Sequence, residues 1–319
     1  MHRGLLLIFL VFSIFSFAQN SRRNTNKSVA YYDNYQRVSI GIHAIHSAEI
    51  KGGVLWVWGK NTYGQLGLGD KKDRTYHVKM TSDSNWVNVC VGSAHTICLK
   101  SDGTLWAWGR NVFGQLGDGT KTDRLTPIQI GTDNQWMAIS AGDSYTLAIK
   151  SDGTLWAWGS NAFRQLGDGT TTSRTSPVKI GTDSTWVKVY AGISHSFGLK
   201  SNGSIWGWGS NADGQIGDKT NIDRASPVKV GLETNWISLS VGSFHTLGLK
   251  SNGTLWAWGF NGEGVLGDSS DISKNRPIQV GSDNNWIFGC EGPAANYAIK
   301  SDGTLWTWGS NNTGHLVVG

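Results

Sequence analysis

The stretch SDGTLWAWGRNVFGQLGDGT, residues 101–120, recurs with small changes about every 50 residues along most of the chain. Copies of its opening start at Lys51, Ser101, Ser151, Ser201, Ser251 and Ser301. A second recurrent half lies between these copies and reads WVNVCVGSAHTICLK from Trp86. A fixed period of this length marks units that cannot bury their apolar faces alone, so neighbouring units must stack on one another.

Alternation of apolar residues within one unit indicates β-strands. Three strands are expected at Leu105–Trp108, Trp136–Ile139 and Tyr145–Ile149. A fourth is expected at residues 127–130 with Pro127 as its first residue, where a missing N–H costs no ladder hydrogen bond. The Asp102-Gly103 pair supplies the positive φ values of a hairpin turn. Four short strands per unit, without helical periodicity, predict an all-β propeller of four-stranded blades.

All 17 Trp residues occupy repeat positions. Burial of one indole removes about 150–250 Å² from water and contributes on the order of 4–6 kcal/mol of gross stabilisation. A ligand cleft lined by Trp is the alternative. Because Trp recurs at the same places in each unit, we expect these side chains to pack the blades.

The order of motifs within the unit resembles the regulator of chromosome condensation repeat family. It reads Gly92-Ser93-Ala94-His95-Thr96, Asp102-Gly103, Leu105 to Gly109, Asn111, Gly114-Gln115-Leu116-Gly117 and Thr126-Pro127. The match recurs over residues 37–319, and the chain is identified as a secreted, bacterial-type member. The resemblance implies a propeller, typically of seven blades. Six copies of the hairpin half are visible, so the ring is either six-bladed or an incomplete seven-bladed one; the second is expected because the sequence stops inside a motif after Leu316.

The first 18 residues have the features of a secretory signal peptide. His2 and Arg3 give a positive end, an apolar run follows, and a small-x-small site ends at Ala18. The apolar run is too short to cross a bilayer comfortably. We therefore expect cleavage before Gln19, a polar lead-in over residues 19–36, the propeller over residues 37–319 and no membrane span. The mature protein is expected to be secreted, extracellular or periplasmic, or held at the cell surface.

Charge and cysteine content argue against a nucleic-acid partner and against structural disulfides. The formal net charge is +5, and the basic residues are dispersed; a nucleic-acid groove needs a basic stripe, so no nucleic-acid partner is expected. Cys90 and Cys290 share one unit position, and Cys98 stands where other units carry Ala or Gly. Cys98 is therefore expected to fill core space, and structural disulfides are not expected.

Metal and catalytic chemistry find little support. A ring of His46, His95, His195 and His245 suggests a metal site. However, neighbouring sheets pack about 10 Å apart, whereas tetrahedral ligands lie about 2.1 Å from one ion. We expect each His to bond the loops of its own blade. The segment 118–124 lacks the spacing of a calcium loop, and the Arg that recurs before the Pro strand fits a loop salt bridge. Without paired carboxylates or a catalytic triad, no enzyme activity, cofactor or metal is predicted.

Residues that vary between units are the candidates for binding. The G-x-x-H and W-G-x-N loops are expected to project from one face, here called the loop face, with the Asp-Gly turns opposite. The residue before each Gly-Gln-Leu-Gly reads Tyr63, Phe113, Phe163, Asp213, Glu263 and Thr313, three aromatics followed by two acids. The candidate binding residues are Tyr63, Phe113 and Phe163, with Lys60, Arg110, Arg164, Phe244 and Phe260. Aromatic and Arg side chains are enriched in interface hot spots; the alternative is that these aromatics lie against neighbouring blades.

These features favour a secreted, non-enzymatic, monomeric module that binds a protein, or else a glycan, through the loop face. The family resemblance agrees, because a secreted bacterial member holds its target enzyme with loops of one face. The resemblance also implies an alternative, guanine-nucleotide exchange, the activity of the eukaryotic founder. Export and a constant unit length, with no room for the inserted wedge of that founder, argue against exchange. A glycan-processing enzyme is the third hypothesis and would need convergent carboxylates.

Overall fold

The computed structural model describes residues 37–40, 44–292, 295–311 and 316. The predicted signal peptide and lead-in lie outside these residues. The described part contains 23 strands. The first three sheets, or blades, contain β1 (Arg37–Ile40), β2 (His46–Lys51), β3 (Val54–Gly59), β4 (Arg74–Lys79); β5 (Trp86–Val91), β6 (His95–Lys100), β7 (Leu105–Gly109), β8 (Arg124–Gln129); and β9 (Trp136–Ala141), β10 (Tyr145–Lys150), β11 (Leu155–Gly159), β12 (Arg174–Lys179).

The remaining three blades repeat this order. They contain β13 (Trp186–Ala191), β14 (His195–Lys200), β15 (Ile205–Gly209), β16 (Arg224–Lys229); β17 (Trp236–Val241), β18 (His245–Lys250), β19 (Leu255–Gly259), β20 (Lys274–Gln279); and β21 (Trp286–Glu291), β22 (Ala295–Lys300), β23 (Leu305–Gly309). Five sheets have four strands and the sixth has three described strands. Within each sheet, consecutive strands pair antiparallel.

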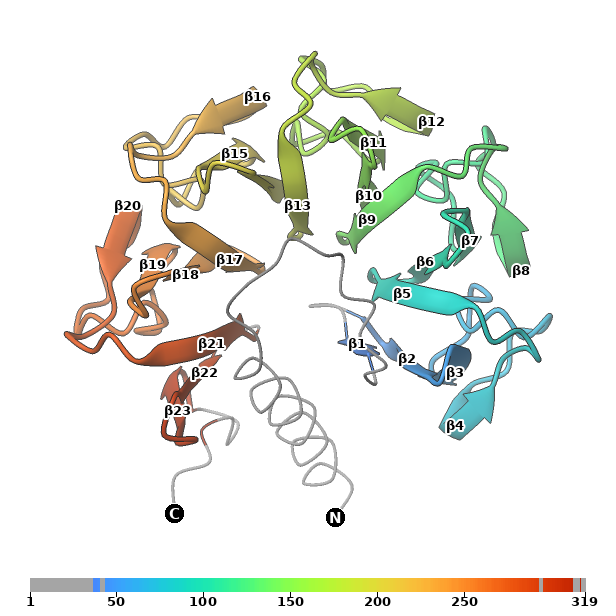
Figure 1. Cartoon of the computed structure of the whole chain (residues 1–319), viewed down its shortest axis with the longest axis horizontal. Coiled ribbons are helices and arrows are strands. Elements are labelled where there is room, and N and C mark those ends of the chain that lie inside the picture. The colour runs from blue at the N-terminus through green and yellow to red at the C-terminus, as the bar shows by residue number, and fades with distance from the viewer. Residues whose placement is uncertain (1–36, 41–43, 293–294, 312–315, 317–319) are drawn as a thin grey trace.

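The six blades follow one another around an arc, with the first strand of each nearest the centre and, in the five four-stranded blades, the fourth strand outermost (Figure 1). This arrangement confirms the all-β propeller and the count of six blades. The alternative of an incomplete seven-bladed ring depends on residues that the structure does not describe.

The predicted strands are confirmed at β7, β9 and β10, but the Pro-led strand begins earlier than expected. Strand β8 starts at Arg124, so Pro127 lies inside the strand and is not its first residue. The register between β7 and β8 shifts between Ala107 and Gly109, and β8 is the outer edge of its sheet. An edge strand tolerates Pro because an N–H directed away from the sheet has no ladder partner to lose.

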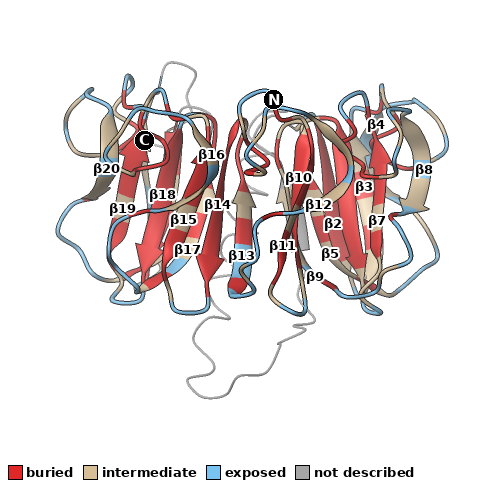
Figure 2. Cartoon of the chain, turned by 90° about the horizontal axis from the view of Figure 1, so that it is seen from above, coloured by how far each residue is buried: buried red, intermediate tan, exposed pale blue. Residues whose placement is uncertain are grey.

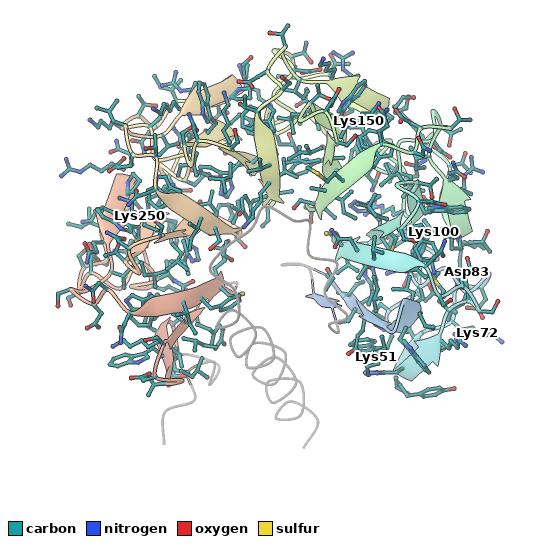
Figure 3. The ribbon with its side chains drawn as sticks, in the orientation of Figure 1. Lys51, Lys72, Asp83, Lys100, Lys150 and Lys250 are labelled. Carbon is teal, nitrogen blue, oxygen red and sulfur yellow. The ribbon has the colours of Figure 1, made fainter. Side chains whose placement is uncertain are left out.

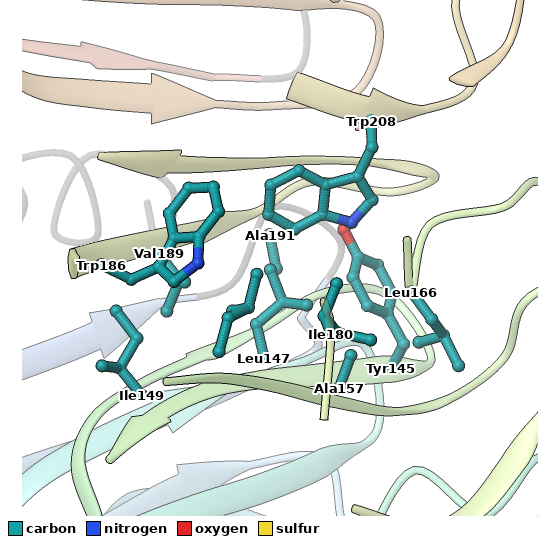
Figure 4. Close-up of a cluster of buried hydrophobic side chains, with 11 residues drawn as sticks. Tyr145, Leu147, Ile149, Ala157, Leu166, Ile180, Trp186, Val189, Ala191 and Trp208 are labelled. Atoms are coloured by element: carbon teal, nitrogen blue, oxygen red, sulfur yellow. The ribbon is translucent and has the colours of Figure 1, made fainter. Parts of the chain in front are cut away.

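The hydrophobic core lies between blades. One cluster combines Leu147 and Ile149 of β10 with Trp186 and Val189 of β13 and with Trp208 of β15 (Figure 4). Second and third strands such as β10 and β11 are therefore mostly buried, whereas first strands such as β9 and outer strands such as β8 and β20 are only partly covered (Figure 2). Each blade completes the core of its neighbour, as expected for stacked repeats.

In the second to fifth blades, two of the three Trp residues are buried and the third is only partly covered. Trp186 packs edge-on against both Trp206 and Trp208, with ring centroids 6.3 and 6.2 Å apart. Trp208 is fully buried, whereas Trp206 is half-buried. The Trp208 Nε1–H donates to the Gln165 carbonyl of the preceding blade at 2.8 Å. The prediction that Trp packs the blades is confirmed, and in four blades one Trp also donates a hydrogen bond to the preceding blade.

A lysine covers the half-buried Trp in five blades. The Lys200 Nζ lies 3.7 Å from the centroid of Trp206 and 4.7 Å from that of Trp186, and it pairs with Asp183. Lys100, Lys150 and Lys250 occupy matching places in other blades (Figure 3). Cation–π contacts of this kind contribute about 0.5–2 kcal/mol each. They occur near the Asp-Gly turns, at the end of the blade opposite the loop face.

The recurring His residues join blades, which corrects the expectation that each bonds only its own loops. The His46 Nε2 lies 2.8 Å from the Thr96 hydroxyl of the next blade, and that hydroxyl donates to the Gln65 carbonyl at 2.8 Å. The His95 Nε2 makes the same contact with Thr146 at 3.3 Å. Burial lowers the pKa of His46 to about 3 and that of His95 to about 4. These imidazoles are therefore neutral at pH 7.

Candidate functional site

The hairpin register gathers the variable loops at one end of each blade. In the second blade His95 lies opposite Gly109, so the loop before β6 and the loop after β7 share an end. Neighbouring G-x-x-H loops are also joined through their backbones. The Ser93 N–H donates to the Asp143 carbonyl at 3.2 Å, and the Ile193 N–H donates to that of Gly242 at 3.2 Å. These bonds join the loop face from blade to blade.

The loop after β7 is held by a polar network that accounts for its repeated residues. The Asn111 amide donates to Asp118 at 2.9 Å and accepts from the Leu116 N–H at 3.0 Å. Arg124 pairs with Asp118 at 2.6 Å. Although burial acts to raise it, hydrogen bonds from Thr120 and Arg124 hold the pKa of Asp118 below its usual value. The predicted loop salt bridge is confirmed, and Lys274 takes the role of this Arg in the fifth blade through Asp268 at 3.2 Å.

Three candidate residues lie on this rigid loop in successive blades. The Phe113 N–H donates to the Gln115 side chain at 3.0 Å, and Phe163 makes the same bond with Gln165 at 2.9 Å. Phe113 is 40% exposed and Phe163 is 54% exposed. Tyr63 is half-buried because Arg110 of the second blade lies over its ring, 4.8 Å from the centroid. Tyr63 therefore lies against its neighbour, as the alternative interpretation expected, whereas Phe113 and Phe163 face solvent.

Arg164 stands in an unusual backbone conformation beside Phe163. Its φ is 65°, at the position where the other blades carry Gly. In two of those blades a Cβ on Gly64 or Gly114 would lie 2.8 or 2.6 Å from a Cα of the next blade. The repeat places Ala225, a small residue, opposite Arg164. A non-Gly residue in the left-handed region costs about 1–2 kcal/mol, and such strain gathers at functional sites.

We use the name aromatic rim for Tyr63, Arg110, Phe113, Phe163 and Arg164. Lys60, which was predicted as a binding residue, forms a salt bridge within its own loop: its Nζ pairs with Asp73 at 2.8 Å. Phe244 and Phe260 belong to a separate group on the fifth blade, where their rings meet edge to face at 6.4 Å. The eight candidate residues thus divide into a rim on the first three blades, a locally paired lysine and a pair of Phe rings.

The Phe pair lines a cavity together with the two acids that follow the aromatics in the sequence. The cavity has a volume of about 420 Å³ and is lined by Asp213, Ser243, Phe244, His245, Phe260, Glu263 and Val265. Asp213 comes from the fourth blade and the other residues from the fifth. We call this cavity the acidic pocket.

Glu291 is a residue that the sequence analysis did not select. Other blades carry Val91, Ala141, Ala191 and Val241 at its position. The Glu291 carboxyl packs on Gly242, since a Cβ there would lie 2.2 Å from Cδ, and Oε2 is 3.2 Å from the His245 Nε2. Burial raises the pKa of Glu291 well above its usual value and lowers that of His245. We therefore interpret the pair as a protonated acid beside a neutral imidazole.

The signal that could have found Glu291 was present in the repeat. A single acid among Val and Ala residues at one inward position is as marked a departure as the acids before Gly-Gln-Leu-Gly. Glu291 differs from the other candidates because it lies at an inward strand position and not in a variable loop.

Metal sites, disulfides and membrane-spanning helices were also sought in the part of the chain that the structure describes. Within it, no group of three or more His, Cys, Asp or Glu side chains could hold a metal ion. Cys90, Cys98 and Cys290, all among these residues, form no disulfide. Among the same residues, no helix has both the length and the apolar character that crossing a membrane would require.

Comparison with known proteins defines the class to which this propeller belongs. The family model described as regulator of chromosome condensation (RCC1) repeat matches residues 52–99, 102–149, 152–199, 202–249 and 252–288. These matches cover well over half of the chain. The chain therefore belongs to the RCC1 repeat family, as the sequence resemblance predicted.

A relative and several solved structures agree with this assignment. The chain is 36% identical over 80 residues to the X-linked retinitis pigmentosa GTPase regulator homolog of Caenorhabditis elegans, a match that covers 24% of this chain and 6% of that protein. Yeast RCC1 (Prp20), solved with Kap60 bound, has a TM-score of 0.75 at 19% identity over 86% of this chain and 69% of that one. Human WBSCR16 has a TM-score of 0.70 at 23% identity over 81% of this chain and 70% of that one. At these identities the solved structures support the fold.

Proposed function

We propose that this chain is a non-enzymatic recognition module that binds a protein through the aromatic rim. The observation that carries the proposal is the exposure of Phe113 and Phe163, 40% and 54%, on hydrogen-bonded loops of consecutive blades. Rigid aromatic side chains lose little entropy on binding and are enriched in hot spots. The strained Arg164 next to Phe163 adds a guanidinium that can make directed hydrogen bonds.

The names of the relatives support a protein as the partner in preference to a glycan. Yeast Prp20p is described with its binding properties to Gsp1p and histones, and yeast RCC1 with bound Kap60. Regulation of a GTPase is the second candidate, favoured by the name of the worm relative. For the recognition module proposed here, addition of the chain is expected to leave the rate of GDP release from Gsp1p unchanged.

The double variant Phe113→Ala, Phe163→Ala tests the rim. The wild-type chain is used to isolate an extracellular protein partner. The Kd of the complex between this partner and each variant is then measured. Loss of two aromatic anchors is expected to weaken binding at least about 30-fold, because one hot-spot side chain contributes about 2 kcal/mol or more. The control is Leu232→Ala, which removes a side chain that is 88% exposed in the loop between β16 and β17, near the Asp-Gly turns. Equal affinities for the double variant and the control would reject the rim.

The same titration with Arg164→Gly separates binding from stability. Gly restores the residue that other blades use at this positive φ. The free energy of unfolding is expected to rise by about 0.5–1 kcal/mol, since relief of strain exceeds the entropic cost of Gly. Binding is expected to weaken at the same time. An unchanged Kd would show that Arg164 does not contribute to binding.

We further propose that the chain is exported and acts outside the cytoplasm. The support is the run of features in residues 1–18, which end in a small-x-small site at Ala18. Expression of the full chain in a secreting host should release a protein whose N-terminal residue is Gln19. Retention of Met1 on protein in the cytosolic fraction would contradict export.

A further inference from the structure

The acidic pocket of the fifth blade has the volume and lining of a site for a small organic group. Its volume of about 420 Å³ lies within the usual range of ligand pockets, about 300–1,000 Å³. Phe244 comes from the loop before β18 and Phe260 from the loop after β19, and their rings meet at 66°. An edge-to-face pair offers aromatic π surface on which a cation can lie.

The charge of this lining has one sign. Asp213 and Glu263 contribute carboxylates, and no Lys or Arg lines the cavity among the described residues. His245 adds no positive charge at neutral pH, because burial lowers its pKa. By contrast, the acid of the loop scaffold in the same blade, Asp268, is paired with Lys274. Asp213 and Glu263 have no such basic partner in the described part of the chain.

A buried carboxyl group lies behind the pocket. Glu291 reaches from β21 to within 3.2 Å of the His245 Nε2, and its side chain is only 1% exposed. Neither of its oxygens has a hydrogen-bond partner among the described residues. The fourth and fifth blades thus contribute Asp213 and Glu263 to the lining, and Glu291 of the sixth blade lies against the His245 of that lining.

The residues that form the pocket are departures from the repeat. The position of Phe244 is Ala94 in the second blade and Ser194 in the fourth, and the position of Phe260 is Ser160 in the third. Constant residues build the blades, whereas the fifth blade alone combines both Phe rings with an acid before the G-x-L-G turn. This combination is not required by the fold.

We propose that the acidic pocket binds a guanidinium group carried on a short aliphatic chain, as in an arginine side chain. A planar guanidinium stacks on aromatic faces and pairs with carboxylates, which matches the Phe pair and the Asp213 and Glu263 carboxylates. The site is distinct from the aromatic rim, so the proposal stands whether or not the rim binds a protein.

The experiment is an NMR titration of the full mature chain with N-acetyl-arginine amide. N-acetyl-citrulline amide, its neutral isostere, serves as the ligand control. We expect saturable shifts of the Phe244 and Phe260 ring signals with the arginine compound and at least about tenfold weaker binding of the citrulline compound, because citrulline lacks the charge for cation–π and carboxylate contacts. Equal affinities, or no saturable shift with the arginine compound, would overturn the proposal.

Two variants test whether the arginine compound binds in the acidic pocket. The pair Asp213→Asn, Glu263→Gln is expected to weaken binding of the arginine compound at least about tenfold. Asp271→Asn, which changes an exposed acid of the same blade outside the lining, is expected to leave it unchanged. Thermal unfolding of the double variant should match wild type, because the lost carboxylates have no basic partner among the described residues. Wild-type affinity in the double variant would exclude the pocket.

Discussion

Replacement of Trp208 with Ala is expected to lower the free energy of unfolding by about 3–5 kcal/mol, the usual cost of removing a large aromatic side chain from a core. Trp208 is fully buried between the third and fourth blades. Its Nε1–H also donates to the Gln165 carbonyl at 2.8 Å. The variant would therefore lose packing on both sides of a blade interface and leave a buried carbonyl with one donor fewer.

Trp206→Ala is the matched control, because it removes the same side chain two residues earlier in the same strand. Trp206 is half-buried and is covered by Lys200 at 3.7 Å from its ring centroid. Loss of partial burial and one cation–π contact is expected to cost roughly half as much, about 1.5–2.5 kcal/mol. Urea unfolding followed by circular dichroism measures both. Equal losses of unfolding free energy in the two variants would show that the blade interface does not depend on Trp208.

Local patterns in the sequence were sufficient to predict the blade. Alternation located β7, β9 and β10, and the Asp-Gly pairs located the turns, because both features depend on near neighbours in the chain. The boundary of β8 was predicted wrongly because an edge strand can contain Pro127 where no ladder bond is needed. The partners of His46 and His95 were also predicted wrongly, since these contacts form between residues about one unit apart in neighbouring blades.

The candidate site was only partly accessible from the sequence. Variation between units correctly selected loop positions, but it could not tell that Arg110 covers Tyr63 or that Asp73 holds Lys60. These outcomes depend on how two loops approach each other. The acidic pocket has the same origin, because it needs Asp213 of one blade beside Phe244 of the next. Sequence separation hid the cavity, although five of its lining residues had already been noticed individually.

Glu291→Gln is expected to change how stability depends on pH. Burial raises the folded-state pKa of Glu291 well above its ordinary value of 4.5. At a pH above that value the unfolded chain releases the proton while the folded chain retains it, so a rise in pH favours unfolding. Stability linked to this group is fully present below pH 4.5 and is lost as pH rises through the folded-state pKa, at up to about 1.4 kcal/mol for each pH unit.

Gln cannot ionise, so the variant should gain stability relative to wild type as pH rises from 5 to 8, and urea unfolding across about that range measures the difference. Protonation of the buried His residues on unfolding lowers stability toward acid, but it acts on both proteins alike and cancels in the difference. Glu263→Gln, the same change at an exposed carboxyl of the fifth blade, is the matched control. If the profile of Glu291→Gln ran parallel to wild type, the native carboxyl would have to be ionised and paired with a charged His245, which is the reading that its burial opposes.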